Sequence, residues 1–251
     1  MSRKTLSVEL SREDAPDGRF YYANIDLPVG MKALLDDACQ QARFQVDNLG
    51  YREITITGCA DLPQLAEIRL DSPTLEELNY LAYRIGQLSE IERVAMQGVV
   101  KRCLDDGAFD GIVPIQDIIN MSYGLDELNV LIGVDDDFSL GSFVLDNDLD
   151  DDLTGLTENV LDMLDMKQVG RRFREREGGI FIRNCYVSAG EYEFPVVFDG
   201  RNVPKDIYCE DGTVFRLKIG QHSAKHAGGT VERAEWIELP ISREQADRIA
   251  K

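Results

Sequence analysis

The sequence predicts an α+β fold, in which small α+β and helical domains follow one another along an elongated chain that ends in a strand-rich extension. Near the start of the chain apolar and polar residues alternate, which is typical of strands. From Ser72 onward apolar residues recur every three to four positions, which is typical of helices, and from Ser188 onward strand patterns return. We therefore expect four domains: an N-terminal α+β domain at residues 1–71, a mainly helical middle domain at 72–125, an acidic α+β domain at 126–187 and a strand-rich C-terminal extension at 188–251.

The N-terminal domain is expected to combine three strands with one helix. Residues 5–10 (TLSVEL) alternate apolar and polar side chains, and residues 20–28 (FYYANIDLP) follow as a second strand. A helix is predicted at residues 31–43 and a third strand at residues 52–57. Together these elements make a small α+β unit.

Two helices open the middle domain, and both begin with the sequence of a capping box. Thr74 is followed three positions later by Glu77, and Ser89 is followed by Glu92. In a capping box each of the two side chains accepts a hydrogen bond from the other residue's backbone N–H group in the first helical turn. The spacing therefore predicts a helical hairpin.

The other elements are predicted from shorter patterns. Residues 107–141 mix short helices with turns, and a helical stretch is expected around residues 114–120. A strand is predicted at residues 140–148, a helical stretch at 156–177 and a strand at 178–187. In the C-terminal extension, strands are expected at residues 191–198, 206–210, 213–220 and 231–240, and a helix capped by Ser242 and Gln245 at 242–251.

The sequence contains no membrane or export signal. No stretch approaches the roughly 18 to 20 consecutive apolar residues that cross a bilayer, and the polar start MSRKTLSVELSRED lacks the apolar core of a signal peptide. We therefore expect a cytoplasmic protein without a membrane partner.

Neither the cysteines nor the histidines predict a metal or redox site. The five cysteines are scattered and form no CxxC pair. His222 and His226 have the spacing of two ligands on one helical face, but the glycines around them favour a loop. The segment from Asp146 resembles the start of an EF-hand loop, but its sixth and twelfth positions are Asp151 and Thr157 instead of Gly and Glu. We expect no metal and no cofactor.

The charge of the chain is concentrated in one segment. The formal net charge is −19. Residues 1–60 contribute −2 and residues 167–251 contribute +2, so residues 61–166 carry a charge of −19. Within them, residues 103–166 hold seventeen carboxylates and no Lys, Arg or His. Because a surface that serves only solubility usually mixes both signs of charge, this acidic segment is a candidate binding surface.

The carboxylates of the acidic segment alternate with apolar residues typical of a protein core, such as Ile118, Leu131 and Val144. A disordered acidic tail lacks such residues, so we expect the carboxylates to project from folded elements. Paired carboxylates also serve acid and base catalysis, but among so many acids a pair at any spacing arises by chance, and we expect neither catalytic residues nor enzyme activity. The candidate partner-binding residues are Asp105, Asp106, Asp110, Asp117, Asp126, Glu127, Asp135, Asp136, Asp137, Asp146, Asp148, Asp150, Asp151, Asp152, Glu158, Asp162 and Asp165.

A basic cluster, formed by Lys167, Arg171, Arg172, Arg174 and Arg176, directly follows the acidic segment. Cations near the C-terminal end of a helix interact favourably with the helix dipole, which is one interpretation of the cluster. The alternative is that the cluster pairs with acids on a second subunit and helps to set a dimer.

Three segments of the chain are distinctive, namely the head with ANIDLP, the segment TLEELNYLAYRIGQLSEIERVAM and the segment LTENVLDMLDMKQVGRRFREREGGIFIRNCYV. Their order along the chain resembles that of the ArdA antirestriction family. The resemblance covers roughly residues 1–187, and residues 188–251 have no counterpart in the short family members. The marks of the family fall on Glu77, Leu78 and Asn79, on Leu164, Asp165, Gly170 and Arg171, and on Gly179 and Phe181.

The resemblance implies a function and a partner. ArdA proteins are elongated homodimers from phages and mobile elements that imitate bent B-form DNA and block the DNA-binding groove of type I restriction-modification enzymes. The stretch that the family associates with blocking restriction falls near residues 100–120 here. By this resemblance the chain is a homodimer in the host bacterial cytoplasm that inhibits such an enzyme and does not itself bind nucleic acid.

The number of carboxylates is consistent with DNA mimicry. Duplex DNA carries about one charge per 1.7 Å of its axis, so seventeen carboxylates correspond to roughly 30 Å of duplex, and those of a dimer to about 60 Å. Two alternatives stay open. The first is a mimic that inhibits another DNA-binding nuclease, such as a CRISPR effector, and the second is an acidic scaffold protein of a phage or mobile element that does not mimic DNA.

Overall fold

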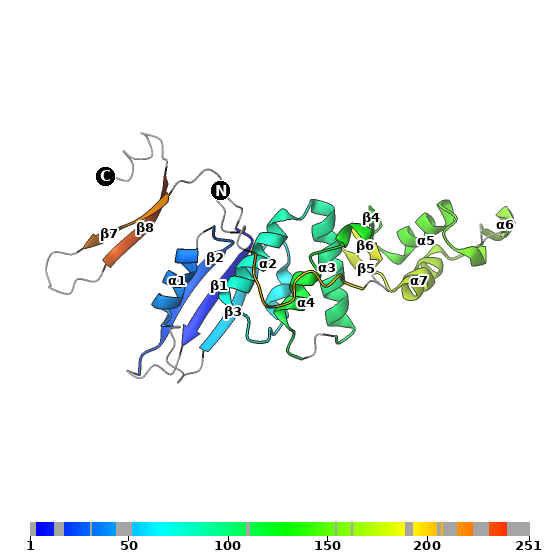
Figure 1. Cartoon of the computed structure of the whole chain (residues 1–251). Helices are drawn as coiled ribbons and strands as arrows, with labels where there is room; N and C mark the ends of the chain where they lie inside the picture. Colours follow the sequence, from blue (N-terminus) through cyan, green and yellow to red (C-terminus); the bar gives the residue numbers. More distant parts are fainter. Residues whose placement is uncertain are drawn as a thin grey trace. The chain divides into compact units, whose positions relative to one another are not determined.

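The computed structural model of the chain separates into two compact units, one at Ser2–Ile207 and one that contains Tyr208–Lys251 (Figure 1). The α+β class predicted from the sequence is confirmed. The division into four domains stays a prediction. The structure describes residues 4–12, 18–30, 32–43, 52–108, 111–153, 155–161, 163–188, 193–204, 207, 215–222 and 231–239.

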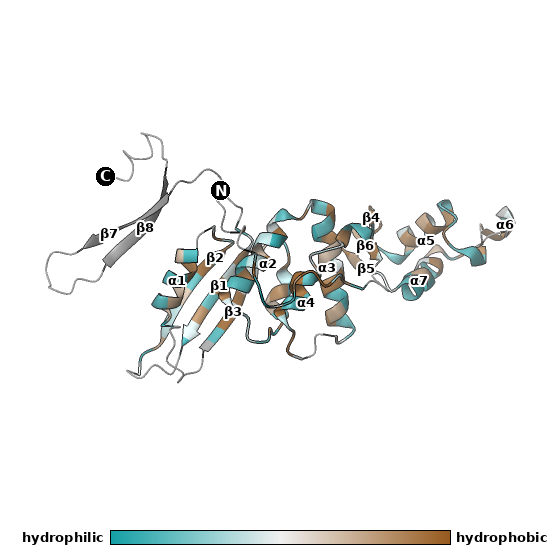
Figure 2. Ribbon diagram, viewed as in Figure 1, coloured by the Kyte–Doolittle hydropathy of each residue, from teal (hydrophilic) through white to brown (hydrophobic). Residues whose placement is uncertain are grey.

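The N-terminal part of the larger unit is a three-stranded antiparallel sheet with one helix. Strands β1 (Leu6–Arg12), β2 (Tyr21–Leu27) and β3 (Arg52–Cys59) lie in the order β2-β1-β3, and helix α1 (Lys32–Gln41) follows β2. Every second residue of β1 is buried, because successive side chains of a strand point to opposite faces. Figure 2 shows this alternation as brown and teal bands along the strands. All four elements predicted for this part are confirmed.

The middle of the larger unit is helical. A short 3-10 helix, η1 (Pro63–Glu67), leads to α2 (Leu75–Gln87) and α3 (Glu90–Asp105). Both predicted capping boxes are present at the starts of α2 and α3. Helix α4 (Ile115–Asn120) coincides with the helical stretch expected around residues 114–120. The two predicted helices are therefore confirmed, but α2 packs mainly on α4 and β2, and α3 packs on other elements, so their packing as a hairpin stays a prediction.

A buried asparagine joins the N-terminal sheet to the helices. The Asn79 side chain on α2 accepts a hydrogen bond of 2.7 Å from the Val29 N–H and donates one of 3.0 Å to the Val29 carbonyl. The Thr5 hydroxyl donates a further bond of 2.8 Å to the Ala82 carbonyl on the same helix. Because these groups are buried and paired, they fix the sheet on α2 without leaving unsatisfied polar atoms.

A second small sheet packs on α3. It follows the 3-10 helix η2 (Leu125–Glu127) and contains β4 (Asn129–Ile132), β5 (Ile180–Ile182) and β6 (Cys185–Ser188) in the antiparallel order β4-β6-β5. The sequence did not predict β4, and the segment predicted as one strand at residues 178–187 is the hairpin of β5 and β6. Gly98 on α3 lies so close to β6 that a Cβ atom there would be 2.8 Å from the Val187 Cβ.

The strand predicted at residues 140–148 is wrong, because this segment belongs to helix α5 (Asp137–Asp146). Asp136 and Ser139 form a capping box that starts the helix, and Leu140 and Val144 lie one turn apart on its buried face. The 3-10 helix η3 (Asp151–Leu153) follows α5. The helical stretch predicted at residues 156–177 is confirmed as α6 (Glu158–Leu161) and α7 (Met166–Glu177).

Helices α5 and α7 approach each other so closely that only glycine fits at two positions. A Cβ atom on Gly141 would overlap the Met166 carbonyl oxygen, and one on Gly170 would overlap the Asp137 carbonyl oxygen. Leu140 and Val144 of α5 also pack with other buried apolar residues. The complete buried cluster is Val134, Leu140, Val144, Val169, Phe173 and Tyr186.

Residues 193–204 return from the second sheet to the helical middle part. The side-chain oxygen of Asn120 accepts hydrogen bonds from the N–H groups of Val197 and Phe198, at 3.1 and 2.8 Å, and its amide donates to the Phe198 carbonyl at 3.0 Å. The Phe198 ring meets Tyr80 edge to face, with centroids 5.6 Å apart. The strand predicted at residues 191–198 is wrong for the described residues 193–198, because Asn120 takes the place of a neighbouring strand.

The smaller unit contains an antiparallel hairpin of β7 (Phe215–His222) and β8 (Val231–Leu239). The strands predicted at residues 213–220 and 231–240 are therefore confirmed. His222 ends β7, and His226 lies outside the described residues. Of the strand predicted at residues 206–210, only Ile207 is among the described residues. The helix predicted at residues 242–251 lies outside the described residues.

Candidate acidic interface

Most carboxylates of the acidic segment are on the surface of folded elements. Asp137 is half-buried and Asp150 is buried. Asp110, Asp162 and the side chain of Glu158 lie outside the described part of the chain. Twelve of the seventeen are exposed, namely Asp105, Asp106, Asp117, Asp126, Glu127, Asp135, Asp136, Asp146, Asp148, Asp151, Asp152 and Asp165.

Five carboxylates from α3 and from the start of α5 line one groove with a volume of about 650 Å³. We call Asp105, Asp106, Asp135, Asp136 and Asp137 the proximal acidic cluster. The same groove is lined by the cations Lys101, Arg102, Lys167 and Arg174. The groove thus brings together carboxylates that are separated by about thirty residues in the sequence, but part of their charge is offset by nearby cations.

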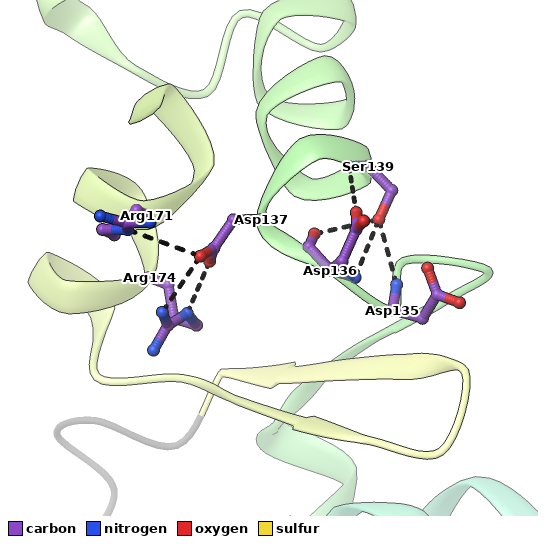
Figure 3. A network of polar contacts seen from close by, with 6 residues as sticks. All are labelled: Asp135, Asp136, Asp137, Ser139, Arg171 and Arg174. Atoms are coloured by element: carbon purple, nitrogen blue, oxygen red, sulfur yellow. Dashed lines mark hydrogen bonds and ion pairs between the residues drawn. The ribbon is translucent and has the colours of Figure 1, made fainter. Parts of the chain in front are cut away.

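Asp137 is held by two arginines of α7 (Figure 3). The Arg174 guanidinium donates two hydrogen bonds to its carboxylate, at 2.8 and 3.3 Å, and Arg171 lies 3.7 Å away. Such paired bonds between a guanidinium and a carboxylate are strong and directional, because both groups are planar and charged. The Asp137 carboxylate raises the pKa of Arg174. Asp137 therefore contributes to the contact between α5 and α7, and only little to the exposed surface.

The two neighbours of Asp137 have different roles. The Asp136 carboxylate accepts a hydrogen bond of 2.7 Å from the Ser139 N–H, and this bond lowers its pKa below the usual value of an aspartate. It caps the start of α5. The Asp135 N–H donates to the Ser139 hydroxyl at 3.1 Å, while the Asp135 carboxylate points away from this network (Figure 3). Asp135 is thus the member of this triplet whose exposed carboxylate neither caps α5 nor pairs with an arginine of α7.

A second group begins at the last residue of α5 and continues after it, and we call Asp146, Asp148, Asp150, Asp151 and Asp152 the distal acidic cluster. Its buried member, Asp150, accepts a hydrogen bond of 3.0 Å from Arg176. Burial alone would raise the pKa of Asp150, but the bonds from Arg176 and from the Asp152 N–H outweigh burial and lower that pKa. The exposed Asp152 lies 3.6 Å from Arg172. Asp146, Asp148 and Asp151 are exposed members whose carboxylates form no ion pair within the described chain.

The basic cluster lies on α7 and pairs with the acidic segment of the same chain. The acidic segment contains no cation of its own, but α7 supplies counter-ions to Asp137, Asp150 and Asp152, and these contacts need no second subunit. Arg174 and Arg176 also lie in the last turn of α7, where cations interact favourably with the helix dipole, as one of the two interpretations of the cluster predicts. The ion pairs join Arg171 and Arg174 to Asp137, Arg172 to Asp152, and Arg176 to Asp150.

The described carboxylates are not arranged as a metal site. Within the residues that the structure describes, no group of three or more His, Cys, Asp or Glu side chains is placed to hold a metal ion. The segment that resembles an EF-hand loop forms the end of α5 and the helix η3, and Asp150 within it is bound by Arg176. Among the described helices, none is long and apolar enough to cross a lipid bilayer.

Several residues that carry the ArdA resemblance hold the fold together. Asn79 binds Val29, Gly170 lies at the crossing of α5 and α7, and Asp165 caps α7 by accepting a bond of 3.0 Å from the Lys167 N–H. The Gly179 backbone lies against the Tyr186 ring. No protein-family model matches the chain, and no curated protein is similar enough to count as a match.

Proposed function

We propose that this protein is an acidic DNA mimic that inhibits type I restriction-modification enzymes by occupying their DNA-binding groove. The observation that carries the proposal is the set of twelve exposed carboxylates between Asp105 and Asp165, which project from helices, turns and loops of a packed scaffold. In this proposal the chain acts as a homodimer in the cytoplasm of a bacterial host, needs no cofactor and catalyses no reaction.

The exposed charge matches a short length of DNA. Twelve carboxylates correspond to roughly 20 Å of duplex at about one charge per 1.7 Å. Carboxylate oxygens accept hydrogen bonds from Arg and Lys as phosphate oxygens do. Since a protein surface offers no base edges, the inhibitor engages the groups of the enzyme that contact the DNA backbone.

The structure separates carboxylates that are available to a partner from those that hold the fold. Asp135, Asp146, Asp148 and Asp151 are exposed, and their carboxylates form no ion pair in the described chain. Asp137 and Asp150 are bound by arginines of α7. Replacing the complete triplets 135–137 and 150–152 would therefore disturb the fold and the surface together, and a sharper variant leaves Asp137 and Asp150 unchanged.

The test compares two variants that lose the same charge. The first carries Asp135→Asn, Asp146→Asn, Asp148→Asn and Asp151→Asn. The matched control carries Asp36→Asn, Glu53→Gln, Glu90→Gln and Glu193→Gln at exposed positions outside the acidic segment.

Binding to a purified type I methyltransferase is measured by titration at several salt concentrations, with and without added duplex DNA. We expect the first variant to bind at least about tenfold more weakly with a shallower salt dependence, because fewer ion contacts form. The control should bind like the unmodified protein, and duplex DNA should compete with all of them. If added duplex DNA does not weaken binding to the methyltransferase, the proposal is contradicted. If both variants lose affinity equally, only the net charge matters, as in an acidic scaffold.

A further inference from the structure

A depression of about 390 Å³ lies beside the N-terminal sheet, between β3 and the segment Ala66–Pro73. In the sheet order β2-β1-β3, the strand β3 is at an edge, and within the described residues its only strand neighbour is β1. In an antiparallel ladder every second residue of an edge strand directs its N–H and C=O groups away from the neighbour. One wall of the depression therefore presents unpaired backbone groups of β3.

The opposite wall presents backbone groups of Leu70. The Val113 N–H donates to the Arg69 carbonyl and the Asp71 N–H donates to the Val113 carbonyl, both at 2.8 Å, which forms a parallel bridge between Leu70 and Val113. In this pattern the N–H and C=O groups of Leu70 itself point away from Val113. Within the described chain neither group has a hydrogen-bond partner, and Leu70 lines the depression.

We infer that this depression is a docking slot for one extended peptide segment of a partner protein, which adds a strand between β3 and Leu70. Exposed strand edges bind extended segments in this way, because main-chain hydrogen bonds supply affinity and alternate side chains supply specificity. Here the added segment finds backbone donors and acceptors on both of its sides. This inference does not depend on the proposed inhibitor function, because none of the carboxylates that line the slot belongs to the acidic segment.

The side chains around the slot define the chemistry of the partner segment. Three exposed carboxylates, Glu53, Glu67 and Asp71, outnumber the one lining cation, Arg69. Four isoleucines also line the slot, and Ile112 is 54% exposed. Since side chains alternate along a strand, the slot fits a segment in which apolar residues alternate with Lys or Arg. The isoleucines are Ile54, Ile56, Ile68 and Ile112.

The probe is a capped seven-residue peptide of alternating Val and Lys with a fluorescent label, titrated into the full chain. We expect saturable binding, and slower hydrogen exchange at the Leu70 amide and at alternate amides of β3 when the peptide is bound. Peptides N-methylated at every second residue, in either register, should bind at least about tenfold more weakly, because one wall then loses its hydrogen bonds. A peptide of alternating Val and Glu should bind more weakly than the Lys peptide, because like charges repel at the slot.

A protein variant tests the charge of the slot. Glu53→Gln with Asp71→Asn should weaken binding of the Lys peptide several-fold, while Glu90→Gln with Glu193→Gln, at exposed positions away from the slot, should not. The inference is overturned if the N-methylated and unmethylated peptides bind equally, if no binding is seen at millimolar peptide, or if the Leu70 amide and the β3 amides that do not pair with β1 are already protected in the chain alone. In the last case the chain itself fills the slot.

Discussion

Two sets of helices in the larger unit, α2 with α3 and α5 with α7, are stabilised by different forces. Helices α2 and α3 begin with complete capping boxes and bury large apolar side chains such as Leu78, Leu81 and Met96. Helices α5 and α7 instead meet at Gly141 and Gly170, and arginines of α7 bind Asp137 at the start of α5 and Asp150 in the segment after it. Helices α2 and α3 depend on apolar burial against their other neighbours, whereas α5 and α7 depend on close backbone approach and on ion pairs in addition to their apolar cluster.

The difference has a consequence for the acidic surface. In the α5–α7 pair the carboxylates are part of the packing, since Asp137 and Asp150 bind Arg174 and Arg176. Their neighbours Asp135 and Asp151 are exposed and form no ion pair in the described chain. The same segment thus contains structural carboxylates next to carboxylates that a partner can reach, and net charge alone does not distinguish them.

The largest effect is expected where α5 and α7 touch. In Gly170→Val the new Cβ atom overlaps the Asp137 carbonyl oxygen, so the helices must separate. We expect the free energy of unfolding to fall by about 3 kcal/mol, at the upper end of the cost of overpacking. Urea unfolding followed by circular dichroism measures the change.

The control for this substitution is Gly111→Ala, because a Cβ atom on Gly111 would meet no atom within 4 Å. This variant should change the free energy of unfolding by less than about 0.5 kcal/mol. If the two variants are equally stable, the close approach of α5 and α7 does not hold the pair together.

The contrast between the two pairs also explains which elements could be predicted from the sequence. The α2–α3 pair was predicted because apolar periodicity and capping boxes are local signals. Helix α5 was predicted as a strand, because Phe143, Val144 and Leu145 form a short apolar run that fits either structure. The signal that would have corrected this is Asp136 three positions before Ser139, a capping box that starts α5.

The second largest effect is expected at the ion pairs of Asp137. In Asp137→Asn the Arg174 guanidinium loses a charged partner at 2.8 Å, and the free energy of unfolding should fall by about 2 kcal/mol, in the range of hydrogen bonds to charged groups. Asp135→Asn, which removes a neighbouring exposed carboxylate, should change it by less than about 0.5 kcal/mol. Thermal unfolding of both variants at low salt provides the comparison, and equal losses would show that Asp137 has no special structural role.

The candidate site could be predicted only in part. The position of the negative charge followed from counting residues, and twelve of the predicted carboxylates are exposed. The pairing of Arg176 with Asp150 could not be predicted, because it depends on how α7 packs against α5 and η3. Burial of Asp150 has no local signal either, since its sequence neighbours Asp151 and Asp152 have the same chemistry and are exposed.

A smaller effect is expected at the start of α3. Ser89→Ala removes the hydroxyl that accepts a hydrogen bond of 3.3 Å from the Glu92 N–H, and the loss of such a cap costs about 1 kcal/mol. Ser142→Ala, on α5, is a control, because its hydroxyl only donates to the Phe138 carbonyl of the preceding turn. The two variants should differ in urea midpoint, with Ser89→Ala the lower. A lower midpoint for Ser142→Ala would mean that the α2–α3 pair does not depend on its capping box.

The smallest effect is a dependence on pH at Asp150. Its pKa is lowered in the folded chain, mainly through the bond from Arg176, while the pKa of an aspartate in the unfolded chain is about 3.9. The pair therefore stabilises the fold above pH about 4, and this contribution is lost as the pH falls through the lowered pKa. Because Arg176 is partly exposed to solvent, the contribution stays below about 1 kcal/mol.

Urea unfolding at pH 7 and at progressively lower pH measures this contribution. The difference in free energy of unfolding between the unmodified protein and Asp150→Asn should shrink as the pH falls, whereas Asp151→Asn should show no such trend. A difference that stays constant with pH would mean that the charge of Asp150 does not stabilise the contact between α7 and η3.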